Sequence, residues 1–134
     1  MSRANVDLVR RNYEAFASEG VDQWLTFWSD DLEFRPSKGG LDDHGPIRGK
    51  VAMKAHIEEW SEDFDKFWFG PVELIDAGEQ TVVAVERFGG HARLSGVETD
   101  QTCAVVFTIR DGKIARGREY ATREEALEAA ALIE

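Results

Sequence analysis

The second half of this 134-residue chain contains successive segments in which apolar and polar residues alternate, and this pattern constrains the fold most strongly. A two-residue period places neighbouring side chains on opposite faces of a β-strand. Gly78-Glu79 and Asp111-Gly112, which lie between such segments, are typical of tight turns. We therefore predict antiparallel strands over residues 67–78, 80–94, 97–110 and 113–120.

The first half of the chain has a helical period instead. Apolar residues recur every three or four positions, which predicts amphipathic helices over residues 4–18, 22–28 and 50–65. A short strand ending at Pro36 and a loop over residues 37–49, rich in Gly, Asp and Pro, separate the second helix from the third. At the other end of the chain, Thr122 followed by Glu125 is a capping-box pattern, and it predicts a helix over residues 122–134.

This order of elements predicts one α+β domain over residues 1–134. The helices at the front must cover one face of a mostly antiparallel sheet. Gly89-Gly90, inside the second long strand, indicate a bulge or a sharp bend. A strongly bent mixed sheet closed by three N-terminal helices would form a cone-shaped barrel with an internal cavity.

Composition and charge exclude several classes of partner. The formal net charge is −10, with 26 acidic and 16 basic residues, which argues against binding to nucleic acid or to anionic membranes. The single cysteine, Cys103, excludes an intrachain disulfide and fits a reducing compartment. Because no apolar run is long enough for a signal peptide or a membrane span, we expect a cytoplasmic protein.

Long stretches of the chain resemble the SnoaL-like branch of the nuclear transport factor 2-like superfamily. They read LVRRNYEAFASEGVDQWLTFWSDDLEF, IRGKVAMKAHIEEW and VVFTIRDGKIARGREYATREEALEAA, and together they cover most of the sequence. The resemblance implies a cone-shaped α+β barrel with a mostly apolar pocket, and a homodimer through the outer sheet surface, as is frequent in this superfamily. Since polyketide cyclases, ketosteroid isomerases and epoxide hydrolases all share this fold, the resemblance does not identify the reaction.

At the known catalytic positions of the superfamily, this sequence has different residues. Asn12 falls where the steroid isomerases carry a tyrosine, with Tyr13 one position away. Arg35 or Pro36 replaces their general base, and Val105 replaces their second acidic donor. The Asp–Arg–Asp relay of the limonene-type epoxide hydrolases has no evident match. Steroid-isomerase chemistry of that type is therefore not expected.

Glu119 is the first catalytic candidate. In the segment IARGREY, Ala115, Gly117 and Glu119 share one face, and the two small residues would leave space beside the carboxylate. A carboxylate in an apolar hollow has a raised pKa, which suits a general acid or base. The alternative interpretation is a structural Glu119 neutralised by Arg35 or Arg87.

Glu86 is the second catalytic candidate. It alternates with Arg87, so only one of the two can face the cavity, and Glu86 shares its face with Phe88. Glu86 and Glu119 together would form a carboxylate pair that shares one proton. The alternative is that the bulge at Gly89-Gly90 turns Glu86 to solvent.

Further residues are predicted to line the pocket, and none to hold a metal ion. His44, His56, His91 and Cys103 show no metal-ligand spacing, so we expect neither a metal site nor a cofactor. The expected substrate-binding residues are Trp28, Phe34, Trp60, Phe88, Arg87 and Asn12.

These residues indicate a cofactor-independent protein that binds a small hydrophobic, cyclic molecule, with proton-transfer catalysis of a cyclase, isomerase or hydrolase kind. Two alternatives remain open: a non-catalytic binding module with the same pocket, and a scaffold subunit that acts through its sheet surface.

Overall fold

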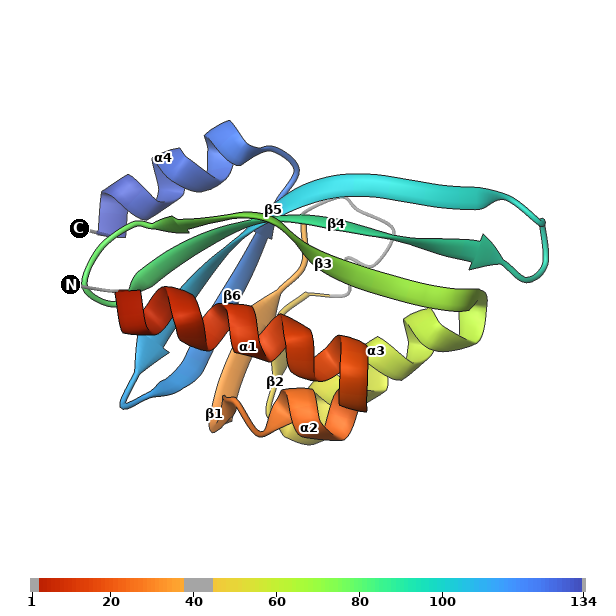
Figure 1. Ribbon diagram of the computed structural model, residues 1–134, viewed down its shortest axis with the longest axis horizontal. Helices are drawn as coiled ribbons and strands as arrows, with labels where there is room; N and C mark the ends of the chain where they lie inside the picture. The colour runs from red at the N-terminus through yellow and green to blue at the C-terminus, as the bar shows by residue number, and fades with distance from the viewer. Residues whose placement is uncertain (1–2, 38–44, 134) are drawn as a thin grey trace.

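The computed structural model describes residues 3–37 and 45–133 (Figure 1). The helices are α1 (Arg3–Glu19), α2 (Val21–Leu25), α3 (Lys50–Asp63) and α4 (Arg123–Ile133). The strands are β1 (Trp28–Arg35), β2 (Ile47–Arg48), β3 (Phe64–Asp76), β4 (Thr81–Ala92), β5 (Glu98–Arg110) and β6 (Lys113–Tyr120). Within these ranges, no helix has the length and apolar character needed to cross a bilayer.

The strands form one curled, mixed sheet in the order β2-β1-β6-β5-β4-β3. Only the β1–β6 pair is parallel; the other described pairs are antiparallel. The sheet is not closed, since β2 and β3 form its edges. Helices α1, α2 and α3 lie on one side of the sheet, and α4 lies on the other (Figure 1). The predicted α+β architecture is confirmed.

Each face of the sheet buries its own apolar cluster. The inner cluster joins the N-terminal helices to the strands and includes Val9 of α1 and Trp28 of β1. The outer cluster is smaller, because α4 presents mainly alanines to the sheet. Thr122 precedes α4 and its Oγ1 accepts a hydrogen bond from the Glu125 backbone N–H at 3.1 Å, as the capping pattern predicts.

Some predicted boundaries are wrong. The second helix ends at Leu25, and Trp28 already belongs to β1, where it pairs with Ile114 of β6. A run of large apolar residues fits either a short helix or a strand, so the pairing with β6 decides the outcome. Ile47–Arg48 add a strand inside the expected loop, and β3 begins at Phe64, directly after α3.

Both β-bulges of the β3–β4 pair place the extra residue in β3, and one of them lies opposite Gly90 of the glycine pair in β4. Two residues of β3, Lys66 and Phe67, lie opposite Gly90 alone, and Lys66 has a φ of 54°. Glycine is required in β4 because the neighbouring strands come close: a Cβ on Gly89 would collide with the Thr99 carbonyl group. β4 pairs with β5 without a register shift. The residues before the glycines therefore lie on the faces of the sheet that simple alternation predicts.

Candidate functional site

A cavity of about 280 Å³ lies between the inner face of the sheet and the N-terminal helices. An engineered apolar cavity of about 150 Å³ holds benzene, so this one has room for a molecule of about two rings. Four predicted aromatic residues line it together: Trp28, Phe34, Trp60 and Phe88. Five aromatic residues that the sequence did not single out complete the lining: Tyr13, Trp24, Phe67, Phe69 and Phe107.

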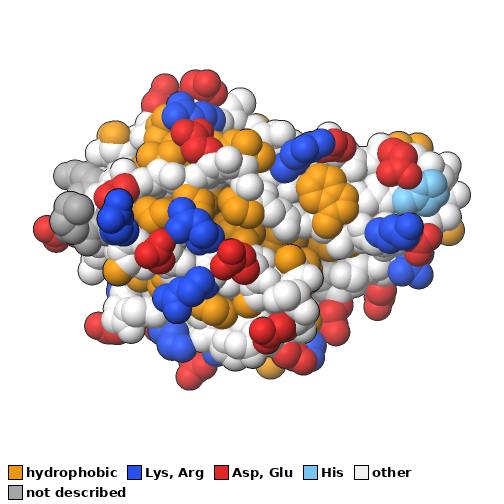
Figure 2. Space-filling view, in the orientation of Figure 1, with side chains coloured by type: hydrophobic (Ala, Val, Ile, Leu, Met, Phe, Trp, Pro, Cys, Tyr) orange, Lys and Arg blue, Asp and Glu red, His pale blue; other side chains and the backbone are white. Residues whose placement is uncertain are grey.

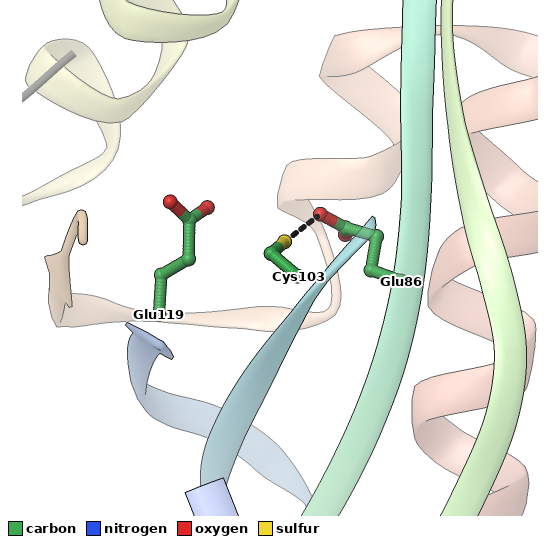
Figure 3. Close-up of side chains that lie close together, drawn as sticks. All are labelled: Glu86, Cys103 and Glu119. Atoms are coloured by element: carbon green, nitrogen blue, oxygen red, sulfur yellow. Dashed lines mark hydrogen bonds between the residues drawn. The ribbon is translucent and has the colours of Figure 1, made fainter. Parts of the chain in front are cut away.

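Three polar side chains meet at one end of this aromatic cavity, each from a different strand (Figure 3). Glu86 of β4 lies directly opposite Cys103 of β5, and Glu119 of β6 lies opposite Val105, two residues further along β5. Antiparallel pairing therefore places all three on the inner face. The Cys103 thiol lies 3.5 Å from Glu86 Oε2, and one donor atom from each residue fits within 4.8 Å of the others.

Glu119 lines the cavity, as the alternation in the last strand predicts. Its Oε1 accepts a hydrogen bond of 3.2 Å from the backbone N–H of Ser37, two residues after the end of β1. Neither predicted arginine partner lines the cavity: Arg35 is exposed, and Arg87 lies on the other face of the sheet. Within the described residues, the predicted ion pairs of Glu119 with Arg35 and with Arg87 are therefore not formed.

The space beside Gly117 is not empty, contrary to the sequence prediction. A Cβ at this position would lie 2.9 Å from the Phe34 ring and 3.2 Å from the Trp28 ring, so these rings fill the space. The alternation is also interrupted, because a register shift between β5 and β6 brings Ile114 rather than Ala115 into the inner cluster. The room near Glu119 therefore comes from the cavity itself.

Arg87 is not a cavity residue, and this prediction is wrong. It alternates with Glu86 and therefore points from the outer face, where its Nε donates to Asp100 Oδ1 at 2.8 Å. Its guanidinium also lies 5.7 Å from the centre of the Trp68 ring. Hydrogen bonding with Asp100 raises the pKa of Arg87 and lowers the pKa of Asp100.

Asn12 lines the cavity, but its side chain is used structurally. Its Nδ2 donates a hydrogen bond of 2.8 Å to the backbone carbonyl of Trp24, and the residue is fully buried. This bond ties α1 to α2 and positions Trp24 against the cavity. A ligand contact with the Asn12 amide would have to compete with it.

Two buried donors in the cavity wall, Tyr13 Oη and Trp28 Nε1, make no hydrogen bond of normal geometry with the described residues. Tyr13 is 4% exposed and Trp28 is 1% exposed, so water does not satisfy them freely. Burial raises the pKa of Tyr13 well above 10.0, and the nearby Glu86 carboxylate raises it further through its charge and through hydrogen bonding, followed by the charges of Cys103 and Glu119. Such orphaned donors are costly unless a ligand uses them.

Sequence patterns did not indicate Tyr13 as a site residue, because the neighbouring position, Asn12, is the one that aligns with the family tyrosine. One signal was present: Tyr13 lies on the apolar face of the first helix, one turn after Val9, where a hydroxyl must be buried. The sequence also gave no sign that Cys103 lies beside two acids, because their proximity depends on strand register.

The histidines occupy separate places. His56 of α3 lines the cavity, with its ring 6.0 Å from the ring of Phe34. His91 Nδ1 lies 2.6 Å from Glu98 Oε1 on the exposed end of the β4–β5 hairpin. His44 lies outside the described residues.

Comparison with known proteins agrees with this fold. Residues 9–117 match the SnoaL-like domain family, and the chain belongs to that family. YesE of Bacillus subtilis (strain 168), an uncharacterised protein, is 26% identical over 112 residues, which cover 82% of this chain and 76% of YesE.

Solved structures show the same fold at low sequence identity. An NTF2-like protein of Burkholderia thailandensis E264 superposes with a TM-score of 0.79 at 22% identity, over 98% of both chains. A Mycobacterium tuberculosis protein, crystallised in complex with estradiol-17beta-hemisuccinate, superposes with a TM-score of 0.74 at 13% identity, over 90% of this chain and 95% of the other. These structures establish the fold alone.

Proposed function

We propose that this protein binds a small, apolar, cyclic molecule in the aromatic cavity and moves a proton on it without a cofactor. The observation that carries the proposal is the pairing of two carboxylates, Glu86 and Glu119, at one end of a cavity that also holds two orphaned donors. The steroid complex of the distant M. tuberculosis protein supports an apolar cyclic ligand.

The proposed reaction uses two kinds of group, carboxylates and hydrogen-bond donors. A carboxylate can remove a proton from the carbon next to a ligand carbonyl group, and the electrons of the broken C–H bond move onto the carbonyl oxygen. The hydroxyl of Tyr13 and the indole N–H of Trp28 are hydrogen-bond donors, and donors stabilise the oxyanion that forms. Since two close carboxylates do not both ionise easily, one of them holds a proton while the other acts as base.

The test uses 1-tetralone, a two-ring ketone with exchangeable protons next to its carbonyl group. Binding is followed by the fluorescence of the cavity tryptophans, and proton transfer by NMR as deuterium replaces these protons in D₂O. Glu119→Gln keeps the shape of the side chain and removes the base, so exchange should fall by about two to four decades with little change in binding. Asp100→Asn, on the outer face, is the matched control and should leave exchange unchanged.

The outcome separates this proposal from its alternative. Binding of 1-tetralone without catalysed exchange would favour a non-catalytic binding module of the same fold. Exchange that persists in both Glu86→Gln and Glu119→Gln would remove the carboxylates from the mechanism. Failure of 1-tetralone and of other two-ring ketones to bind would reject both readings and favour the scaffold alternative.

We also propose a homodimer through the outer sheet surface. Thr102, Arg116 and Arg118 remain exposed there, whereas α4 covers Ala104 and Val106 and so reduces the predicted interface. Light scattering at micromolar concentration should give twice the monomer mass of 15.1 kDa, and a monomer would reject the proposal.

A further inference from the structure

The strongest additional feature is the convergence of a thiol and two carboxylates from three adjacent strands (Figure 3). Glu86, Cys103 and Glu119 present one donor atom each within 4.8 Å of the others. All three face the cavity, and Cys103 is buried while the two acids are half-buried. This set of one soft and two hard donors is of the kind that binds borderline-soft divalent ions.

We propose that Glu86, Cys103 and Glu119 form a binding site for a divalent transition-metal ion of the zinc type. The inference goes beyond the proposed function and does not depend on it. It assigns a ligand to the polar end of the cavity, whereas the aromatic part of the cavity takes the organic molecule.

One distance already matches such a site. In a tetrahedral complex with a Zn–S bond of about 2.3 Å and a Zn–O bond of about 2.0 Å, the sulfur and oxygen atoms lie about 3.5 Å apart. Cys103 Sγ and Glu86 Oε2 are separated by 3.5 Å. Glu119 presents an oxygen within 4.8 Å of both, and a rotation of its flexible side chain that moves the carboxylate by about 1 Å would complete three ligands.

Tyr13 gives an independent indication of a ligand at this place. Tyr13 is 4% exposed and lines the same cavity, and its hydroxyl makes no hydrogen bond of normal geometry with the described residues. Zinc sites with three protein ligands keep a fourth position for water or substrate, and neighbouring donors orient the groups around the ion. A hydroxyl that faces the cluster can donate to that water or to a liganding carboxylate.

Charge explains why a cation would be stabilised there. Two carboxylates brought this close in a low-dielectric cavity repel each other when both are ionised. A divalent ion removes that repulsion and also favours the thiolate form of Cys103. Because the ion would occupy the same oxygens that move protons, zinc should also inhibit the proton transfer proposed above.

The primary test is titration of the wild-type protein with Zn²⁺ and with Co²⁺. Calorimetry should give one Zn²⁺ per chain. Co²⁺ should produce a thiolate-to-cobalt charge-transfer band in the near ultraviolet, which reports directly on Cys103 and needs no variant. Absence of one-to-one binding, or Co²⁺ binding without that band, would overturn the proposal.

Variants identify the ligands. Cys103→Ser, Glu86→Gln and Glu119→Gln should each weaken Zn²⁺ binding by about tenfold or more, since each removes one ligand. His91→Gln is the matched control, because His91 and Glu98 form an exposed pair of a kind that binds zinc adventitiously. Binding that survives Cys103→Ser in a folded protein, or that disappears in His91→Gln, would contradict the assignment.

Discussion

The two faces of the central strands place charged residues in different environments. On the outer face, Arg87 is paired with Asp100, and both side chains are about half exposed. On the inner face, one residue before Arg87, Glu86 lies in an aromatic cavity together with a thiol and a second carboxylate. Alternation along a strand thus separates a surface ion pair from a candidate chemical site by a single residue.

The exterior shows the ordinary arrangement of surface charge. On the face shown in Figure 2, basic and acidic side chains are interspersed among apolar areas. Opposite charges there lie near one another and in water, so each contributes little to stability. On the inner face, two acids lie in the same cavity as the buried donors of Tyr13 and Trp28. Such an arrangement lowers stability, and it is typical of a site where a bound ligand supplies the missing hydrogen bonds.

The largest expected difference between the faces concerns two tryptophans. Trp28 is 1% exposed in the inner cluster, and Trp68 is 40% exposed on the outer side. Trp28→Ala should lower the free energy of unfolding by about 3–5 kcal/mol. Trp68→Ala should lower it by about 1 kcal/mol or less, mainly through its contact with Arg87. Urea unfolding measures both, and equal losses would contradict the assignment of inside and outside.

Two strand glycines give the next contrast. A Cβ added at Gly117 would press on the packed rings of Phe34 and Trp28, so Gly117→Ala should destabilise the protein by about 1–3 kcal/mol. Gly70 lies opposite Arg87, and a Cβ there would meet nothing within 4 Å. Gly70→Ala should therefore be neutral or stabilise by about 0.5 kcal/mol. Thermal and urea unfolding distinguish the two, and a tolerated Gly117→Ala would indicate that the cavity wall is loose.

Tyr13→Phe separates ligand binding from stability. The Tyr13 hydroxyl makes no hydrogen bond of normal geometry with the described residues, so its removal should change the free energy of unfolding at pH 7 by no more than about 0.5 kcal/mol. Affinity for 1-tetralone should fall about fivefold if the hydroxyl donates to the ligand, which corresponds to about 1 kcal/mol. A large loss of stability at pH 7 would mean that the hydroxyl is bonded within the protein.

The same residue predicts an alkaline effect. The folded-state pKa of Tyr13 is raised above its unfolded value of about 10, chiefly by burial, so the folded state holds the proton more tightly. Its contribution to stability is complete below pH 10 and is lost as the pH rises through the folded pKa. Tyr13→Phe should remove that part of the alkaline loss, as measured by unfolding at a series of pH values. An unchanged alkaline profile would contradict the burial of the phenol.

The smallest effect is expected on the outer face at acid pH. The pKa of Asp100 is lowered by its hydrogen bond with Arg87, so its contribution to stability is present above the unfolded pKa of about 4 and is lost as the pH falls through the folded value. Asp100→Asn should remove this small acid-dependent part of the melting temperature. Added salt should weaken it in the wild-type protein, because the pair is exposed. A profile insensitive to both changes would show that the pair contributes nothing measurable.

Much of the architecture could be predicted from local patterns. The two-residue period identified the long strands, the helical period identified α1 and α3, and Thr122 with Glu125 identified the start of α4. These signals are local, because each depends on residues within a few positions of one another. The same two-residue period predicted that Glu86 and Glu119 face the cavity, which both of them line.

Strand pairing and side-chain packing decided the rest. Trp28 was assigned to a helix and belongs to a strand, since its pairing with β6 joins residues far apart in the chain. The space expected beside Gly117 is filled by Phe34 and Trp28, which alternation in β6 alone could not indicate. Cys103 joins Glu86 and Glu119 only because β4, β5 and β6 align in one register. The sequence therefore determined which face each strand residue occupies, whereas the tertiary structure decided which residues meet there, because a meeting between strands depends on register and packing that no single segment contains.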